Sequence, residues 1–174
     1  TLSSHEVSLG YKEVADPSVY VRFRALDAEN TSFLVWTTTP WTLPSNLCLA
    51  VGLDVDYVYA DTGTETLIVA EALAEAALGG SEYTVTRSVK GRDLVGQRYQ
   101  RLFDYLSVDP AENCWQVLAG EFVSTEDGTG IVHCAAAYGV DDLALCQAHG
   151  MPVVHGVGLD GCFKAEVEPV AGLF

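Results

Sequence analysis

Two segments of the chain concentrate side chains that can hold a polar ligand. The first is Trp36-Thr37-Thr38-Thr39-Pro40-Trp41-Thr42-Leu43-Pro44-Ser45-Asn46, where three threonines follow a β-branched and aromatic stretch. Pro40 has no N–H and disfavours a helical Thr39, so we expect a strand to end here. Hydroxyls at the mouth of a strand can point into a cleft and both donate and accept hydrogen bonds. The same residues also fit a strand end without chemistry, followed by a short helix that Thr42, or Ser45 with Asn46, caps.

The second segment spans residues 128–142. Gly128 and Gly130 allow a close backbone approach before a strand that ends at His133. A loop of small residues follows and leaves room for a ligand, before two acids open a helix. Capping of the helix dipole explains Asp141, whereas Asp142, one position further in, could instead face an ammonium group.

Familiar reaction motifs are absent from the sequence. There is no G-x-S-x-G, C-x-x-C, H-x-x-x-H or G-x-x-x-x-G-K-[ST] pattern, so we predict no metal and no bound nucleotide triphosphate or dinucleotide. The five cysteines are odd in number and widely spaced, which is typical of reduced, mostly buried thiols in a cytosolic protein.

The elements that must position these side chains are mostly short strands. The periodicity of the sequence predicts a mixed α/β, β-rich domain whose core is like a β-barrel, with a few short peripheral helices. We expect strands over 19–26, 32–37, 57–60, 66–70, 83–89, 116–123, 129–134 and 153–157, and helices over 71–78 and 141–149.

Composition limits the class of protein. The 174 residues are 49% hydrophobic and 19% charged, which fits one folded domain and excludes a disordered chain. No run approaches eighteen apolar residues, so we expect no membrane span. The formal net charge of −15 argues against a stand-alone nucleic-acid binder, because phosphate contacts need clustered Lys and Arg.

The two segments resemble the editing domain of isoleucyl-tRNA synthetases, the insertion often called CP1. Weaker similarity in residues 1–14, 91–99 and 157–163 extends the resemblance over nearly the whole chain. Relatives that edit valine or leucine tRNAs usually carry an Arg where this chain has Thr39 and an acid where it has Trp41, which points to the isoleucine enzyme. The chain departs from the family in the loop 135–137, which reads Ala-Ala-Ala where a Pro is usual.

The resemblance implies an editing-domain fold of class Ia synthetases. The chain lacks an initiator Met and a polar tail, so we expect one domain over 1–174, excised from a longer synthetase, with junction segments 1–14 and 165–174. The partners implied are the rest of the synthetase chain and the 3′ end of tRNA(Ile) carrying valine. We expect a cytoplasmic monomer without cofactor, since ATP serves only the synthetic domain.

The implied activity is hydrolysis of the ester in valyl-tRNA(Ile), with valyl-adenylate as a further candidate substrate. Isoleucine and valine differ by one methylene, a difference that a synthetic site separates poorly, and isoleucyl-tRNA synthetase is the standard example. By resemblance, Asp142 holds the α-ammonium and His133 walls the side-chain pocket against isoleucine. The strip that positions adenosine, ester and water comprises Thr37, Thr38 and Thr39, with Trp41 and Asn46 as further binding residues.

Two other functions stay open on the sequence. The domain could bind the aminoacyl 3′ end without hydrolysing it, or be a general β-rich hydrolase with Thr and His in its site. The acidic charge adds an expectation to the editing hypothesis: the isolated domain receives only the flexible 3′ end, which carries few phosphates, and binds tRNA weakly.

Overall fold

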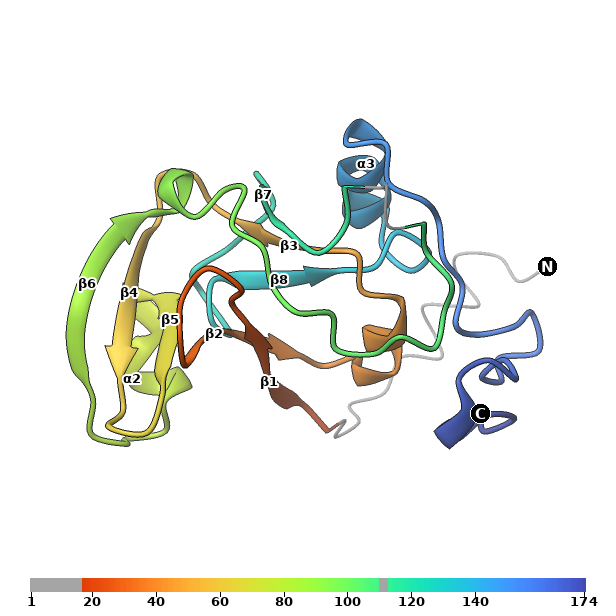
Figure 1. The fold of residues 1–174 in the computed structure, drawn as a ribbon, viewed down its shortest axis with the longest axis horizontal. Coiled ribbons are helices and arrows are strands. Elements are labelled where there is room, and N and C mark those ends of the chain that lie inside the picture. The colour runs from red at the N-terminus through yellow and green to blue at the C-terminus, as the bar shows by residue number, and fades with distance from the viewer. Residues whose placement is uncertain (1–16, 110–112) are drawn as a thin grey trace, which may run out of the picture.

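The computed structural model describes residues 17–109 and 113–174, whose strands form two sheets (Figure 1). The larger sheet has the order β1-β2-β5-β4-β6 and the smaller one the order β7-β3-β8. The parallel pairs are β2 with β5 and β3 with β7, and the other neighbours are antiparallel. The strands are β1 (Val19–Arg24), β2 (Thr31–Thr37), β3 (Cys48–Val51), β4 (Asp56–Asp61), β5 (Thr66–Ala70), β6 (Thr84–Lys90), β7 (Val117–Ala119) and β8 (Ile131–Cys134).

The helices are few and short, as the sequence predicts. Only α3 (Val140–Ala148) exceeds two turns among the described residues. The remaining helical segments are one or two turns long: η1 (Pro40–Ser45), η2 (Glu71–Leu73), α2 (Ala74–Ala77), η3 (Gly91–Asp93) and η4 (Glu168–Val170). The chain is therefore strand-rich, with helices at the ends of strands.

One apolar core lies between the two sheets. Phe23, Phe33 and Tyr57 of the larger sheet pack in the same buried cluster as Leu49 and Ile131 of the smaller one. A backbone hydrogen bond of 2.9 Å from the Ala70 N–H to the Thr129 carbonyl also joins the two sheets. Because the two sheets share this core, it holds the end of β2 in a fixed position beside β8 (Figure 1).

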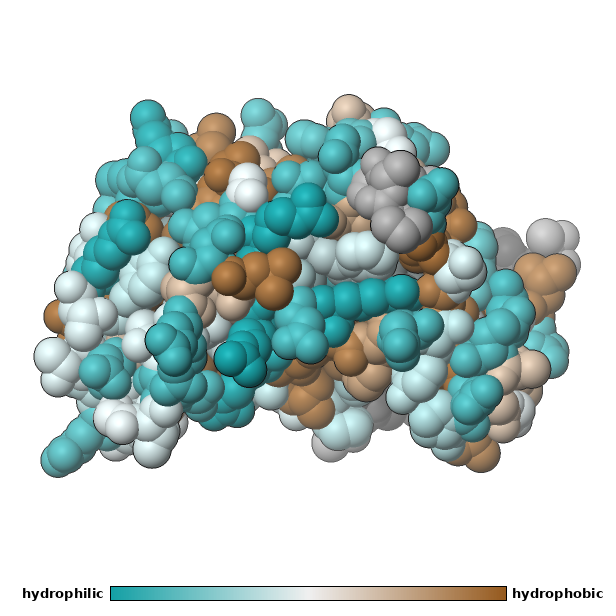
Figure 2. Space-filling model, in the orientation of Figure 1, coloured by the Kyte–Doolittle hydropathy of each residue, from teal (hydrophilic) through white to brown (hydrophobic). Residues whose placement is uncertain are grey.

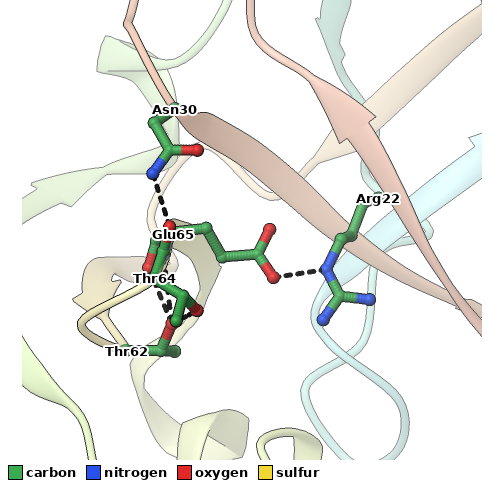
Figure 3. A network of polar contacts seen from close by, with 5 residues as sticks. All are labelled: Arg22, Asn30, Thr62, Thr64 and Glu65. Carbon is green, nitrogen blue, oxygen red and sulfur yellow. Dashed lines mark hydrogen bonds and ion pairs between the residues drawn. The ribbon is translucent and has the colours of Figure 1, made fainter.

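A polar network ties the turn before β2 to the turn before β5 (Figure 3). The Asn30 side-chain amide donates to the Thr64 carbonyl at 2.6 Å, and Arg22 pairs with Glu65 at 2.6 Å. The Arg22 side chain is 55% exposed, so this ion pair adds little stability. The network instead fixes the start of the parallel β2–β5 pair, whose other end carries the threonines.

Most predicted elements lie where the periodicity places them, and the strand predicted over 153–157 is wrong. There the structure has only an isolated bridge between Val157 and Phe163. The Gly156 N–H is bound by the side chains of Ser45 at 3.1 Å and Tyr138 at 2.9 Å. Since side chains satisfy this backbone, it has no need of a neighbouring strand.

Other departures concern length and one missed strand. The strand expected over 116–123 is limited to β7, and the helix expected over 71–78 is the 3₁₀ turn η2 followed by the single turn α2. β3, the central strand of the smaller sheet, is not among the strands expected from the sequence. Of the expected junction segments, 1–14 lies outside the described residues, and 165–174 contains η4.

The surface and the thiols agree with the composition. None of the five cysteines, which all lie in the described part of the chain, is in a disulfide, and four of them are buried. The face shown in Figure 2 is mostly hydrophilic, with scattered apolar residues. In the part of the chain that the structure describes, no helix is long and apolar enough to cross a bilayer.

Gly130 allows the close approach of the sheets. Its φ is +70°, and a Cβ at this position would lie 2.4 Å from the Cβ of Ala70. Gly63 has a similar φ of +82° but nothing within 4 Å of such a Cβ. A substitution at Gly63 would therefore introduce backbone strain alone, whereas one at Gly130 would introduce both backbone strain and steric overlap.

We expect Gly130→Ala to lower the free energy of unfolding by about 2–5 kcal/mol, since backbone strain and overpacking act together. Gly63→Ala, the matched control, should lose only about 1–2 kcal/mol from the left-handed backbone. Denaturant unfolding of both variants provides the measurement. Equal losses would show that the sheets do not depend on this contact.

Candidate functional site

A cavity of about 390 Å³ lies where β2 ends beside β8. Its walls come from the end of β2, η1, the turn before β8, β8 itself and the first turn of α3. The lining residues are Trp36, Thr37, Thr38, Thr39, Trp41, Thr42, Phe122, Ser124, Asp127, Gly128, Thr129, Gly130, Ile131, Val132, His133, Ala135, Tyr138 and Asp142. The structure thus brings the two segments singled out in the sequence to one cavity.

The three threonines have different surroundings. Thr37 is buried, and its hydroxyl accepts a hydrogen bond of 3.1 Å from the Thr39 N–H. Thr38 and Thr39 are exposed on the cavity wall. Among the described residues the Thr38 hydroxyl has no hydrogen-bond partner, and Thr39 Oγ1 has only a long contact of 3.4 Å with Thr37 Oγ1. Thr37 therefore shapes the strip, and the next two hydroxyls are available to a ligand.

His133 is buried in the cavity wall with both ring nitrogens hydrogen-bonded. Nε2 lies 2.7 Å from Thr42 Oγ1, and Nδ1 lies 3.2 Å from Asn46 Nδ2. The Thr42 hydroxyl gives its own proton to the Thr39 carbonyl at 2.8 Å. Thr42 Oγ1 must therefore accept from His133, while the Asn46 amide must donate to it. These directions assign His133 as the neutral tautomer with its proton on Nε2.

Burial also keeps this imidazole neutral. It lowers the pKa of His133 to about 4. A proton added at Nδ1 would face the Asn46 amide N–H, so the hydrogen bonds disfavour the cation as well. With both nitrogens in use, His133 presents its ring to the cavity as a neutral wall.

Asp142 occupies the first turn of α3, at the rim of the cavity. Its Oδ2 accepts a hydrogen bond of 2.8 Å from the Ala135 N–H. A Cβ at Gly139 would lie 2.9 Å from the Asp142 Cγ, so the glycine leaves space for the carboxylate to fold back. The contact connects α3 to the loop after β8 and leaves Oδ1 for another partner.

The environment of Asp142 favours a positive ligand. Burial raises the pKa of its carboxyl, the Ala135 N–H opposes that rise, and the charge of Asp141 adds to it. A cation placed beside the carboxylate would restore the ionised form. Asp142 is therefore suited to hold an ammonium group.

The two remaining predicted residues differ in position. Trp41 is 44% exposed and packs edge-on against Tyr138, with ring centroids 4.9 Å apart, at the cavity wall. Asn46 is buried and does not line the cavity. It lies behind His133, which it contacts through the side-chain amide.

Several lining residues were not identified as site residues from the sequence. Thr42 lies in the threonine segment and was expected only as a possible cap of the following helix. In the structure no side chain caps η1, and the Thr42 hydroxyl is hydrogen-bonded to His133 instead. Ser124 and Asp127 lie in a turn without a distinctive pattern. Within residues 17–109 and 113–174, no cluster of His, Cys, Asp and Glu side chains is arranged to hold a metal.

The low pKa of His133 predicts how stability depends on pH. The unfolded histidine binds a proton near its ordinary pKa of 6.5, whereas the folded one binds it only near 4. The neutral His133 therefore contributes to the free energy of unfolding in full above pH 6.5. This contribution, about 3 kcal/mol in all, is lost as the pH falls toward 4.

Urea unfolding of the wild type and His133→Gln between these pH values tests this dependence. The stability advantage of the wild type over the variant should shrink as pH falls. An advantage that is constant with pH would mean that the pKa of His133 is the same in the folded and the unfolded protein.

Sequence comparison finds similar proteins over nearly the whole chain. Isoleucine–tRNA ligase from Clostridium tetani is 44% identical over 172 residues, 99% of this chain, and that from Thermobifida fusca is 46% identical over 177 residues, 100% of this chain. The ligase from Thermoplasma acidophilum is 46% identical over 174 residues. The chain spans only 16–17% of the length of these relatives. No protein-family model matches it.

Solved structures share the fold. The P. knowlesi cytosolic leucyl-tRNA synthetase editing domain aligns with a TM-score of 0.58 and 15% identity, covering 80% of this chain and 64% of that one. GlLeuRS-CP1 aligns with a TM-score of 0.58 and 23% identity, covering 70% of this chain and 46% of that one. Over its full length the chain is 44–46% identical to one segment of isoleucine–tRNA ligases, and it has the fold of these editing domains. The chain therefore belongs to the isoleucyl-tRNA synthetase family as an editing (CP1) domain.

Proposed function

We propose that this domain hydrolyses valyl-tRNA(Ile), releasing valine and uncharged tRNA. The observation that carries the proposal is one cavity bounded by a neutral His133, the Asp142 carboxylate and two available threonine hydroxyls. Each group matches one part of an aminoacyl ester: the side chain, the α-ammonium, and the ester with its ribose.

Asp142 would bind the α-ammonium through Oδ1, while Oδ2 keeps its bond to the Ala135 N–H. An ion pair in a partly dry pocket orients the aminoacyl group strongly. Since only the carboxylate binds the ammonium, hydrolysis should fall as pH drops through the raised pKa of Asp142.

His133 would act by shape. A buried ring held from both sides cannot move aside cheaply for a larger side chain. The additional methylene of isoleucine would meet this ring, whereas valine fits. Because neither nitrogen is available, His133 takes no proton during the reaction.

Thr38 and Thr39 would position the ester and the attacking water. The water oxygen adds to the ester carbonyl carbon, the bond from that carbon to the ribose oxygen then breaks, and the ribose oxygen takes up the proton that the water loses. An activated ester needs only an oriented water and hydrogen bonds to the developing oxyanion. A hydroxyl of the substrate itself can assist, so no covalent nucleophile is required.

The wider setting is part of the same proposal. The rest of a synthetase chain would hold the body of the tRNA, and this domain would receive the 3′ end. We place that enzyme in the cytoplasm, with a monomeric editing domain over 1–174 that needs no cofactor and leaves ATP to the synthetic domain. Valyl-adenylate would be a further substrate of the same pocket.

One observation favours a second function, binding without hydrolysis. The buried His133 has no nitrogen for a water, so the described cavity residues include no neutral imidazole that is available as a base. A domain that only bound the aminoacyl end would keep the Asp142 contact and release no valine. Release of free valine separates the two functions.

Asp142→Asn should reduce kcat/KM for valyl-tRNA(Ile) by about a hundredfold or more, because the ammonium loses a desolvated charge partner. Asp141→Asn is the matched control, since that acid lies outside the cavity, and it should stay within about twofold of the wild type. Released valine is measured after mixing protein with mischarged tRNA. Near-normal hydrolysis by Asp142→Asn would refute this role.

His133→Ala should open the pocket to isoleucine and raise hydrolysis of isoleucyl-tRNA(Ile) by about tenfold or more, the order expected for one methylene. His149→Ala, at the exposed end of α3, is the control and should change nothing. If isoleucyl-tRNA(Ile) stays fully protected with His133→Ala, the ring is not the steric wall.

A further inference from the structure

Tyr99 contacts the site from outside it. Its side chain is 1% exposed, packs edge-on against Phe23 at 5.3 Å, and does not line the cavity. Its hydroxyl donates a hydrogen bond of 2.7 Å to Asn46 Oδ1. Burial raises the pKa of the phenol well above its ordinary value, so it remains a neutral donor.

Asn46 connects Tyr99 to His133, because its side chain is hydrogen-bonded to both. Its two amide protons go to the Cys48 carbonyl at 3.0 Å and to His133 Nδ1 at 3.2 Å. Its backbone carbonyl accepts from the Trp115 indole at 3.2 Å, and its backbone N–H binds the Leu43 carbonyl at 3.0 Å. Every donor of Asn46 is used within the protein, so it has none to offer a ligand.

We propose that Tyr99 and Asn46 are positioning residues that set substrate specificity through His133. The relay runs in one direction: the Tyr99 O–H donates to Asn46, Asn46 donates to His133 Nδ1, and His133 Nε2–H donates to Thr42. The relay fixes both the tautomer and the position of the ring. The part about specificity rests on the proposed function, whereas the tautomer does not.

The Tyr99 hydroxyl matters because Asn46 is buried. Without it, Oδ1 would be an acceptor without a donor, which a protein interior tolerates poorly. The amide would shift toward another partner, and its bond to Nδ1 would weaken. The ring would then be held from Thr42 alone and would yield more easily to a larger substrate.

The first test reads the ring directly. Long-range proton–nitrogen NMR on the 174-residue chain near neutral pH should show His133 protonated on Nε2, with Nδ1 as a hydrogen-bonded acceptor. With four histidines in the chain, His133→Gln identifies its signals. Tyr99→Phe should move the Nδ1 signal toward a free acceptor. Tyr59→Phe, at a buried tyrosine whose hydroxyl contacts Gln97 rather than Asn46, should leave it unchanged.

The second test measures specificity. Tyr99→Phe should lower the ratio of valyl- to isoleucyl-tRNA(Ile) hydrolysis about three- to tenfold, the equivalent of one hydrogen bond, with a smaller effect on valyl-tRNA(Ile) alone. Asn46→Asp should have a larger effect, because a carboxylate accepts from Nδ1 and reverses the tautomer.

The outcomes are distinct. Identical His133 signals in Tyr99→Phe and wild type, or a wild-type ring protonated on Nδ1, would overturn the relay. If Tyr99→Phe fails to fold, the wild-type tautomer and the Asn46→Asp spectrum still decide. If the unaltered chain hydrolyses neither ester, the proposed function fails, while the ring signals judge the relay independently.

Discussion

A neutral imidazole with no spare nitrogen is the constraint around which this site is built. His133 is buried, its pKa is lowered to about 4, and its two nitrogens face a donor and an acceptor of fixed direction. A cation or the other tautomer would leave a buried polar group unmatched. The ring is therefore a rigid apolar surface with a single orientation, which suits discrimination by size rather than proton transfer.

The fold keeps this arrangement in register. His133 lies on β8, Thr42 lies on η1, and Asn46 directly follows η1. The shared core sets β2 and β8 at a constant separation, and Gly130 lets the chain before β8 pass close to Ala70 of β5. Asp142 joins from α3 through the Ala135 N–H, so the charge that would orient a substrate and the ring that would exclude a larger one rest on one backbone segment.

The two segments singled out in the sequence, which the structure brings to one cavity, could be recognised because each carries local signals: a proline that ends a strand, and glycines before one. The sequence missed β3 because Cys48–Val51 is short, buried on both faces and without alternation. It predicted a strand over 153–157 because β-branched residues outweighed what only three dimensions show, namely the side chains of Ser45 and Tyr138 on that backbone. The hydrogen bond from Tyr99 to Asn46, fifty-three residues away in the chain, likewise has no local pattern.

In the function that we propose, a rigid wall and a fixed charge select the smaller aminoacyl group for hydrolysis. The most direct measurement is the ratio of valine released from valyl-tRNA(Ile) to isoleucine released from isoleucyl-tRNA(Ile) by the unaltered chain. We predict a ratio on the order of a hundred or more. A tight pocket excludes a side chain that is too large by steric overlap, and this discriminates more strongly than the weaker binding of a side chain that is too small for an open pocket. Equal release of both amino acids, or release of neither, would contradict the account.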